Sequence, residues 1–149
     1  MTAFLLDVNV LIALAWKGHP DHRVAQDWFA RNNKAGWATC PFTEAAFVRI
    51  ISNPAFSPEA VLPLEALSLL TANLNHVTHQ FWADNISLRD RFRHFGERLV
   101  GHQQVTDAYL LGLAMHKKGK LATLDRSMVE LFNRSDPKAE TVELISGKQ

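Results

Sequence analysis

The chain has 149 residues, a length typical of one folded domain. Hydrophobic residues make up 47% of it and charged residues 21%, which excludes a disordered or fibrous protein. With 16 lysines and arginines against 15 aspartates and glutamates, the formal net charge of +1 neither supports nor excludes binding to a polyanion such as nucleic acid.

The cysteine count and the hydropathy pattern exclude further classes of protein. A single cysteine, Cys40, allows neither an intramolecular disulfide nor a multi-cysteine zinc site. No apolar run reaches the roughly 18 residues that cross a bilayer. The apolar start of the chain carries Asp7 where a signal peptide has no charge. We therefore expect a mature cytoplasmic protein that does not enter a membrane.

The first half of the sequence alternates short apolar runs with longer amphipathic segments. Short apolar runs suit buried strands, and apolar residues recurring at three- and four-residue steps suit helices. Ser57 and Pro58 are typical of a helix cap followed by proline at the first helical position. The expected elements are a strand at 3–6, helices at 8–16 and 20–33, a strand at 37–40, helices at 43–52 and 58–74, and a strand at 76–81.

The second half continues this alternation. Residues 105–118 are almost wholly apolar in the middle, which predicts a helix buried on several sides and ended by Gly119. The expected elements are helices at 87–99 and 105–118, a strand at 121–124, a short helix at 126–132 and a last strand at 141–145. Strands that alternate with helices predict a single α/β domain over residues 1–149, with a parallel sheet covered on both faces.

Four acidic residues stand out by their position. Asp7, Glu44 and Asp125 each lie just past the carboxyl end of a predicted strand, the edge at which open α/β sheets bind ligands. Asp107 lies in the first turn of the most apolar predicted helix. A simpler interpretation stays open for each of the first three, because Asp7 and Asp125 also fit helix N-caps and Glu44 fits an ordinary helix start.

A parallel sheet can bring these four carboxylates together. Clustered carboxylates repel one another and raise some of their pKa values unless a cation neutralises them. An all-oxygen cluster suits Mg²⁺ or Mn²⁺ as the cation. Asn9, Thr106 and Thr123 lie one or two residues from the acids and can orient a carboxylate, a water or a phosphate.

Two other sites weigh less. His76 and His79 have the spacing of metal ligands, but a three-residue step in a strand points them to opposite faces, so zinc is not expected. Residues 89–98 are rich in arginine, which predicts either a solvated helix face or a track for an RNA backbone. The candidate RNA-binding residues are Arg89, Arg91, Arg93 and Arg126.

Three segments resemble those of PIN-domain ribonucleases, and more narrowly those of the VapC toxins of bacterial VapBC toxin–antitoxin modules. They are LLDVNVLIAL near the start, WATCPFTEAAFVRIISNPAF in the middle and GHQQVTDAYLLGLAMHKKGKLATLDRSM near the end. They follow in the same order, at similar spacing, over residues 4–132. The resemblance implies a PIN-like three-layer fold in which helices flank a central, mainly parallel sheet.

The resemblance also implies an activity and partners. It matches Asp7, Glu44, Asp107 and Asp125 to the metal-binding acids of the family, with Asn9 and Thr106 as polar neighbours. Family members hydrolyse RNA phosphodiester bonds with water activated by Mg²⁺ or Mn²⁺, form homodimers and are neutralised by a cognate VapB-like antitoxin. Some carry a further acid near the third position, where this chain has Gln103 and Gln104, so a second metal is expected to be weakly held or absent.

Two rival functions remain at this point. A non-catalytic PIN-fold binding or scaffold domain would keep the fold, although retention of all four acids argues against it. Phosphatases like the haloacid dehalogenases also place an aspartate after the first strand, but they require a second one two residues later, where this chain has Asn9.

Overall fold

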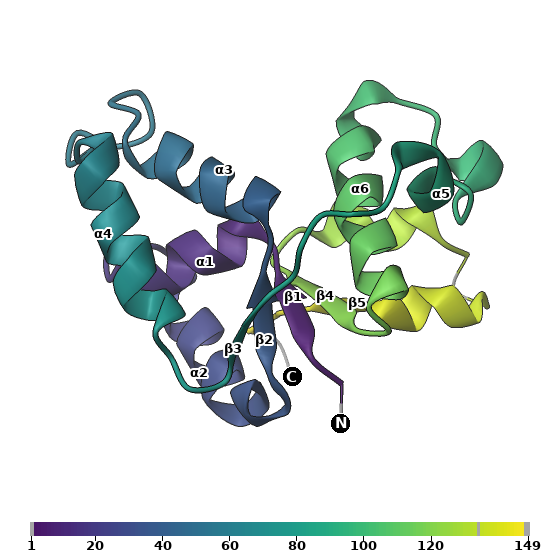
Figure 1. Cartoon of the computed structure of the whole chain (residues 1–149), viewed down its shortest axis with the longest axis horizontal. Coiled ribbons are helices and arrows are strands. Elements are labelled where there is room, and N and C mark those ends of the chain that lie inside the picture. Colours follow the sequence, from purple (N-terminus) through teal and green to yellow (C-terminus); the bar gives the residue numbers. More distant parts are fainter. Residues whose placement is uncertain (1, 134, 148–149) are drawn as a thin grey trace.

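A five-stranded parallel sheet forms the centre of the computed structural model, which describes residues 2–133 and 135–147 (Figure 1). The strands are β1 (Phe4–Leu6), β2 (Trp37–Thr39), β3 (His79–Phe81), β4 (Lys120–Thr123) and β5 (Val142–Leu144). Their order in the sheet is β3-β2-β1-β4-β5, and every neighbouring pair is parallel. The carboxyl ends of all five strands therefore lie at one edge.

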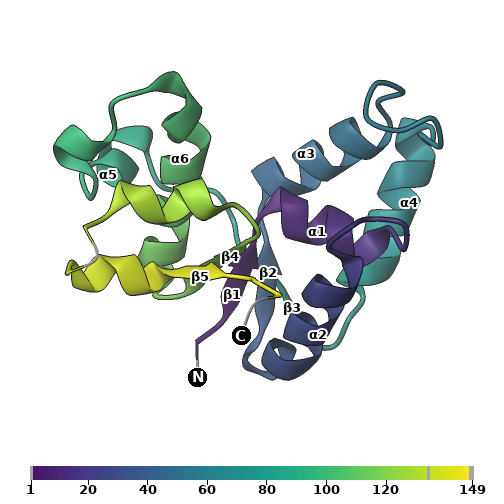
Figure 2. The ribbon, with the colours of Figure 1, turned by 180° about the vertical axis from the view of Figure 1, so that it is seen from behind.

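Helices cover both faces of this sheet (Figures 1 and 2). One face carries α1 (Val8–Ala15), α2 (His22–Asn32), α3 (Pro41–Ile51) and α4 (Pro63–Leu74), and the other carries α5 (Leu88–Phe92) and α6 (Val105–His116). Short 3₁₀ helices span Asn33–Ala35, Gly96–Arg98, His102–Gln104, Arg126–Leu131 and Pro137–Thr141. This arrangement confirms the predicted three-layer α/β fold. Over the described ranges, no helix is long and apolar enough to cross a membrane.

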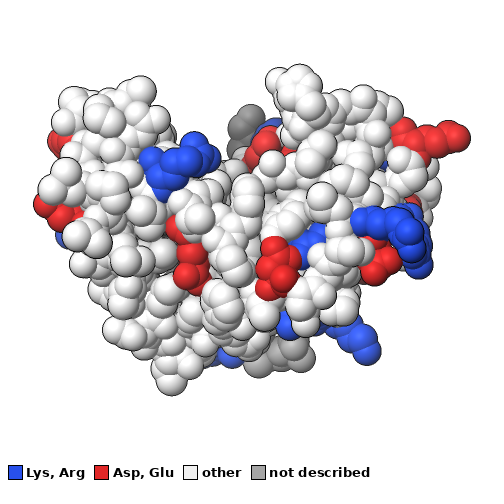
Figure 3. All heavy atoms as spheres, turned by 45° about the horizontal axis from the view of Figure 1, so that its top comes forward, with Lys and Arg blue, Asp and Glu red and all other residues white. Residues whose placement is uncertain are grey.

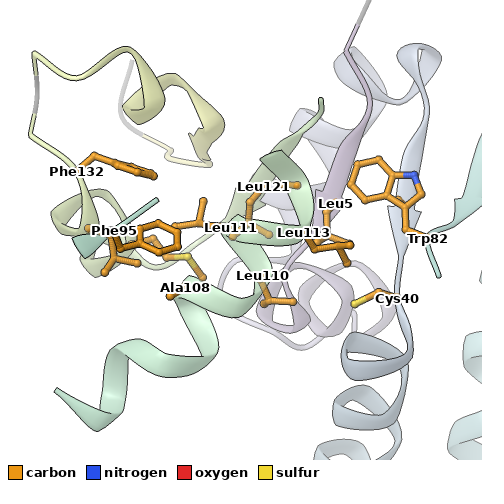
Figure 4. Packing of buried hydrophobic residues seen from close by; sticks show 14 residues of the cluster. Leu5, Cys40, Trp82, Phe95, Ala108, Leu110, Leu111, Leu113, Leu121 and Phe132 are labelled. Carbon is orange, nitrogen blue, oxygen red and sulfur yellow. The ribbon is translucent and has the colours of Figure 1, made fainter. Parts of the chain in front are cut away.

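The core alternates between the two faces with the period of a strand. In β1, Phe4 and Leu6 pack towards α1–α4, whereas Leu5 packs towards α6. Figure 4 shows Leu5 among the leucines of α6, with Cys40 buried at the end of β2. Cys40 is thus a core residue. Because α6 lies between the sheet and α5, it is apolar on several sides.

Four predicted element boundaries are wrong, and the first is the start of the third strand, which lies at His79 and not at residue 76. The fourth helix begins at Pro63 with Leu62 as its N-cap, and the Ser57 hydroxyl instead accepts a hydrogen bond from the Glu59 amide in a turn. The helix expected at 87–99 ends at Phe92, and Gly96 follows with φ of +53°. The left-handed residue after α6 is Lys118, with φ of +56°. Gly119 instead allows a close approach, since a Cβ there would lie 2.6 Å from the Trp82 ring.

Arg91 fastens α5 to α6. Its side chain is 0% exposed, and its guanidinium donates hydrogen bonds to the backbone carbonyls of Ile86 (3.0 Å) and Tyr109 (2.9 Å). The same group pairs with Asp84 and lies 3.9 Å from the centre of the Tyr109 ring. Gly112 makes room for this contact, because a Cβ there would lie 2.6 Å from the Arg91 Cβ.

The prediction that Arg91 binds RNA is therefore wrong. All of its side chain is withdrawn from the surface, and its donors serve the chain's own carbonyls and carboxylate. A guanidinium buried without partners would be strongly destabilising. Arg91 instead links α5 to α6 inside the protein.

Candidate active site

Asp7 lies at the centre of the candidate site because it follows the middle strand β1 and caps α1. Its Oδ1 accepts a hydrogen bond from the Val8 amide (2.7 Å), and its Oδ2 accepts one from the Thr123 hydroxyl (2.8 Å). Asp7 is only 7% exposed. Burial raises the pKa of Asp7 above its usual 3.8, against the effect of these hydrogen bonds, and the charge of Asp125 raises it further.

Thr123 and Asn9 tie the end of β4 to Asp7. Besides donating to Asp7, the buried Thr123 hydroxyl accepts hydrogen bonds from the Asp125 amide (3.0 Å) and the Asn9 side chain (3.4 Å). Asn9 in turn accepts one from the Leu124 amide (3.2 Å). The structure thus brings Thr123 into contact with the first acid and joins Asn9 to it through Thr123.

Asp125 caps the 3₁₀ helix Arg126–Leu131. Its Oδ1 accepts hydrogen bonds from the Ser127 amide (2.9 Å) and hydroxyl (2.8 Å). Among the residues that the structure describes, none donates a hydrogen bond to its Oδ2. Asp7 and Asp125 are therefore both helix caps and electrostatic neighbours, so the two interpretations of these residues are compatible.

Asp107 lies in the first turn of α6, half-buried. Burial, followed by the negative charges of Asp7 and Asp125, raises the pKa of Asp107 to about 6. No cation and no hydrogen-bond donor within the described chain offsets these effects. Thr106, its expected partner, is exposed beside it. Three aspartates from distant segments thus share one electrostatic environment.

Glu44 stands apart from this group. It lies in the first turn of α3, and its Oε2 accepts a hydrogen bond from the Thr39 hydroxyl (2.7 Å), which is also 2.8 Å from His79 Nε2. Glu44 is not among the charges that raise the pKa of Asp7 or Asp107. The structure therefore groups three of the four expected acids closely and directs the fourth towards β2 and β3.

Sequence reasoning did not single out Thr39, and it considered His79 only as a zinc ligand. The parallel register pairs Thr39 with Phe81 and Trp37 with His79, so Thr39 and His79 are diagonal neighbours on one face of the sheet. They lie 40 residues apart in the chain. No local pattern carries that information, because it depends on which strands pair and in which register.

The donor chemistry of the site fits a hard divalent cation. Carboxylate and hydroxyl oxygens are the ligands that Mg²⁺ and Mn²⁺ prefer, and a cation would relieve the repulsion that raises these pKa values. Figure 3 shows acidic side chains gathered in the middle of the face at the strand carboxyl ends. In the described residues, however, no three His, Cys, Asp or Glu side chains are arranged to hold one ion. The metal site itself therefore stays a prediction.

Comparison with known proteins identifies the family. Residues 4–134 match the PIN domain family model. The chain is 43% identical over 142 residues to Ribonuclease VapC38 of Mycobacterium tuberculosis (strain ATCC 25618 / H37Rv), covering 95% of this chain and 97% of the relative. It belongs to the VapC family of PIN domains. The predicted family resemblance is thus confirmed.

Further relatives agree with this assignment. The VapC-family chain is 41% identical over 130 residues to Ribonuclease VapC39 of Mycobacterium tuberculosis (strain CDC 1551 / Oshkosh), covering 87% of this chain and 93% of that one. A structural match is the crystal structure of VapBC2 from Rickettsia felis bound to a DNA fragment from their promoter. It has a TM-score of 0.63 over 97% of this chain and 99% of that one. At 13% sequence identity, this match supports the fold alone.

The other three candidate RNA-binding arginines lie on the surface of this PIN domain. Arg89, Arg93 and Arg126 are exposed, and Arg126 directly follows the acidic Asp125. Arg93 pairs with Asp90 at 3.0 Å, with the two side chains 70% and 53% exposed. An exposed pair of this kind contributes little to stability. These three arginines remain predicted RNA contacts.

Proposed function

We propose that the chain is a toxin endoribonuclease that hydrolyses RNA phosphodiester bonds with water activated by Mg²⁺ or Mn²⁺. Membership of a family whose relatives are ribonucleases supports the substrate and the reaction. The observation that carries the proposal is the group formed by Asp7, Asp107 and Asp125 beside the carboxyl edge of the sheet. Besides burial, the charge of Asp125 raises the pKa of Asp7, and the charges of Asp7 and Asp125 raise the pKa of Asp107. Repulsion between neighbouring carboxylates destabilises a folded protein, so a purely structural role does not account for this group.

In this proposal the metal is held by Asp7, Asp107 and Asp125, with Glu44 as the fourth carboxylate. A divalent ion supplies a low-pKa water and polarises a phosphoryl oxygen. Thr123 orients Asp7 by donating to its Oδ2, and Asn9 holds the turn after β4 in place. Thr106 is exposed next to Asp107, where its hydroxyl can reach a phosphate. Attack by water on phosphorus releases a 3′-hydroxyl and leaves a 5′-phosphate, and no side chain becomes covalently linked.

The exposed arginines are proposed to hold the RNA backbone. Arg89, Arg93 and Arg126 are exposed cations that can contact backbone phosphates. Figure 3 shows acidic side chains in the middle of this face, with basic and further acidic side chains around them. The net charge of +1 does not report this uneven distribution.

A VapB-like antitoxin is the proposed inhibitor. Between α1, α2 and α4 lies a cavity of about 480 Å³, and its apolar lining includes Leu14, Phe29, Leu70 and Leu74. Leu64 and Leu67 of α4 are 77% and 48% exposed nearby on the same helix. Such a surface suits the apolar side of a partner segment. With the family we also propose a homodimer and a cytoplasmic location.

Sequencing the RNA ends made by purified protein tests the proposal. Wild type with Mn²⁺ should produce discrete 5′-phosphate ends, and EDTA should abolish them. Asp7→Asn and Asp107→Asn should lose the cuts while keeping the fold, whereas Asp27→Asn, at an exposed position on α2, should keep them. Cuts that persist in both active-site variants would exclude this site. A wild type that neither cuts RNA nor binds Mn²⁺ would favour a non-catalytic scaffold.

A further inference from the structure

Two side chains outside the expected site form a hydrogen-bonded path to Glu44. The Thr39 hydroxyl on β2 lies 2.7 Å from Glu44 Oε2 and 2.8 Å from His79 Nε2 on β3. The path therefore joins two adjacent strands to the first turn of α3. Thr39 and His79 lie on the face of the sheet that α3 covers, whereas Asp107 lies on α6, which covers the opposite face.

The Thr39 hydroxyl behaves like that of Thr123 at the end of β4 and unlike the hydroxyls of the neighbouring helices. Thr43, Ser68 and Thr71 each donate to a backbone carbonyl three or four residues away, which satisfies the hydroxyl locally. Thr39 is 0% exposed and instead donates to a carboxylate on another element. A charge-assisted hydrogen bond from a buried donor is short, directional and stronger than a neutral one. It restricts the rotamer of Glu44.

The protons of this path can be assigned from its chemistry. A carboxylate only accepts, so the single hydroxyl proton of Thr39 is directed to Glu44. His79 Nε2 must then carry a proton and donate to Thr39 Oγ1. Both the neutral Nε2–H tautomer and the imidazolium meet this requirement. The ring is also held by Trp37, with ring centres 4.7 Å apart.

We propose that Thr39 and His79 are positioning residues that hold the Glu44 carboxylate for the divalent metal. The inference rests on the proposed metal-dependent function and names residues that the acidic pattern does not include. Only Oε2 is used by Thr39, and within the described residues nothing donates a hydrogen bond to Oε1, which leaves that oxygen for a cation. Outer-sphere partners of this kind commonly change metal affinity by about 10- to 100-fold when they are removed.

Mn²⁺ affinity of the purified full chain, measured by calorimetry without RNA, tests the inference independently of catalysis. Thr39→Val keeps the shape of the side chain but removes the donor, and it should weaken Mn²⁺ binding about 10-fold. Thr39→Ser keeps the hydroxyl donor and should bind Mn²⁺ as tightly as the wild type. His79→Leu should also weaken binding, and His79→Gln should retain it because the Gln amide can donate from the position of Nε2.

Three comparisons make the experiment decisive. Thr71→Val, which removes an exposed hydroxyl of α4, is the matched control and should leave Mn²⁺ affinity unchanged. The double variant Thr39→Val/His79→Leu should bind no worse than Thr39→Val alone, because both changes interrupt one path. Thermal unfolding of the metal-free variants, followed by circular dichroism, establishes that each is folded.

The outcomes separate this inference from the proposed function. If Glu44→Gln weakens Mn²⁺ binding and folded Thr39→Val does not, the positioning role is refuted while the metal site stands. If the wild type binds Mn²⁺ and Glu44→Gln binds it equally well, Glu44 is not a ligand and the inference fails with it. A wild type without Mn²⁺ affinity overturns the proposed function itself.

Discussion

Replacing Asp107 with asparagine should stabilise the metal-free protein at neutral pH. Burial and the charges of Asp7 and Asp125 raise the pKa of Asp107 from 3.8 to about 6, so above pH 6 the folded chain holds an ionised carboxylate in surroundings that disfavour it. This rise in pKa corresponds to a loss of at most about 3 kcal/mol in the free energy of unfolding when the carboxyl group is ionised. Solvent screening of a half-exposed group reduces the expected gain to about 1 kcal/mol, or roughly 2–4 °C in Tm for a domain of this size.

The sign of the pH dependence follows from proton linkage. Because the folded state binds the Asp107 proton more tightly than the unfolded state, the wild-type free energy of unfolding falls as pH rises from about 4 to about 6 and levels off above that. The advantage of Asp107→Asn should therefore be largest at pH 7.5. At pH 4.5 it should shrink to about a third.

Urea denaturation in EDTA at these two pH values measures the effect. Asp27→Asn, an exposed aspartate on α2, controls for the loss of one negative charge and should change stability little. When Mn²⁺ replaces EDTA in this assay, it should stabilise the wild type and not Asp107→Asn. The raised pKa of Asp107 would be refuted if Asp107→Asn is no more stable than the wild type at pH 7.5. It would also be refuted if the gain in stability is the same at both pH values.

Further predictions concern the helix brace and the RNA surface. Gly112→Ala should lower the free energy of unfolding by about 1–3 kcal/mol despite the better helix propensity of alanine, because the new Cβ meets Arg91; chemical denaturation measures this, and an unchanged midpoint would contradict the close packing. Arg91→Ala should cost about 3 kcal/mol in the same assay, since it removes a fully buried side chain and leaves the Ile86 and Tyr109 carbonyls without their donor, while the salt dependence of RNA binding stays as in wild type. Arg93→Ala should leave stability nearly unchanged but lower the magnitude of the slope of log K against log salt by about 1; an unaltered slope would assign Arg93 to a solvated helix face. The Mn²⁺ affinity of the wild type should rise as pH increases through about 6, because the Asp107 proton that competes with the metal is lost. Calorimetry that finds no such rise would argue against Asp107 as a ligand.

Sequence reasoning predicted the sheet and the places of Asp7 and Asp125 just after its strands because these signals are local. A short apolar run followed by Asp7 specifies both a strand and the cap of the next helix, and the turn after β4 repeats the same pattern with Asp125. Strands that alternate with helices then restrict the sheet to parallel pairing. These features require no knowledge of what lies opposite in space.

Sequence reasoning missed two features that depend on distant neighbours and one whose local signal is ambiguous. Arg91 lies in an arginine-rich segment that looks solvated, and only the docking of α5 on Gly112 of α6 shows that it is buried. The direction of the Glu44 side chain depends on the pairing of β2 with β3, which a single sequence does not contain. The late start of α4 was missed because two prolines, Pro58 and Pro63, both fit the first turn of a helix.

The hydrogen bond from Thr123 to Asp7 closes a loop of 116 residues, and this has a consequence for synthesis of the chain. On the ribosome Asp7 emerges early, but Thr123 and Asp125 join it only when most of the domain has been made. On the proposed function, the nascent chain cannot cut the message that encodes it. Helices α1, α2 and α4 all precede residue 75. The residues that line the cavity between these helices are therefore all synthesised before those that complete the acidic group.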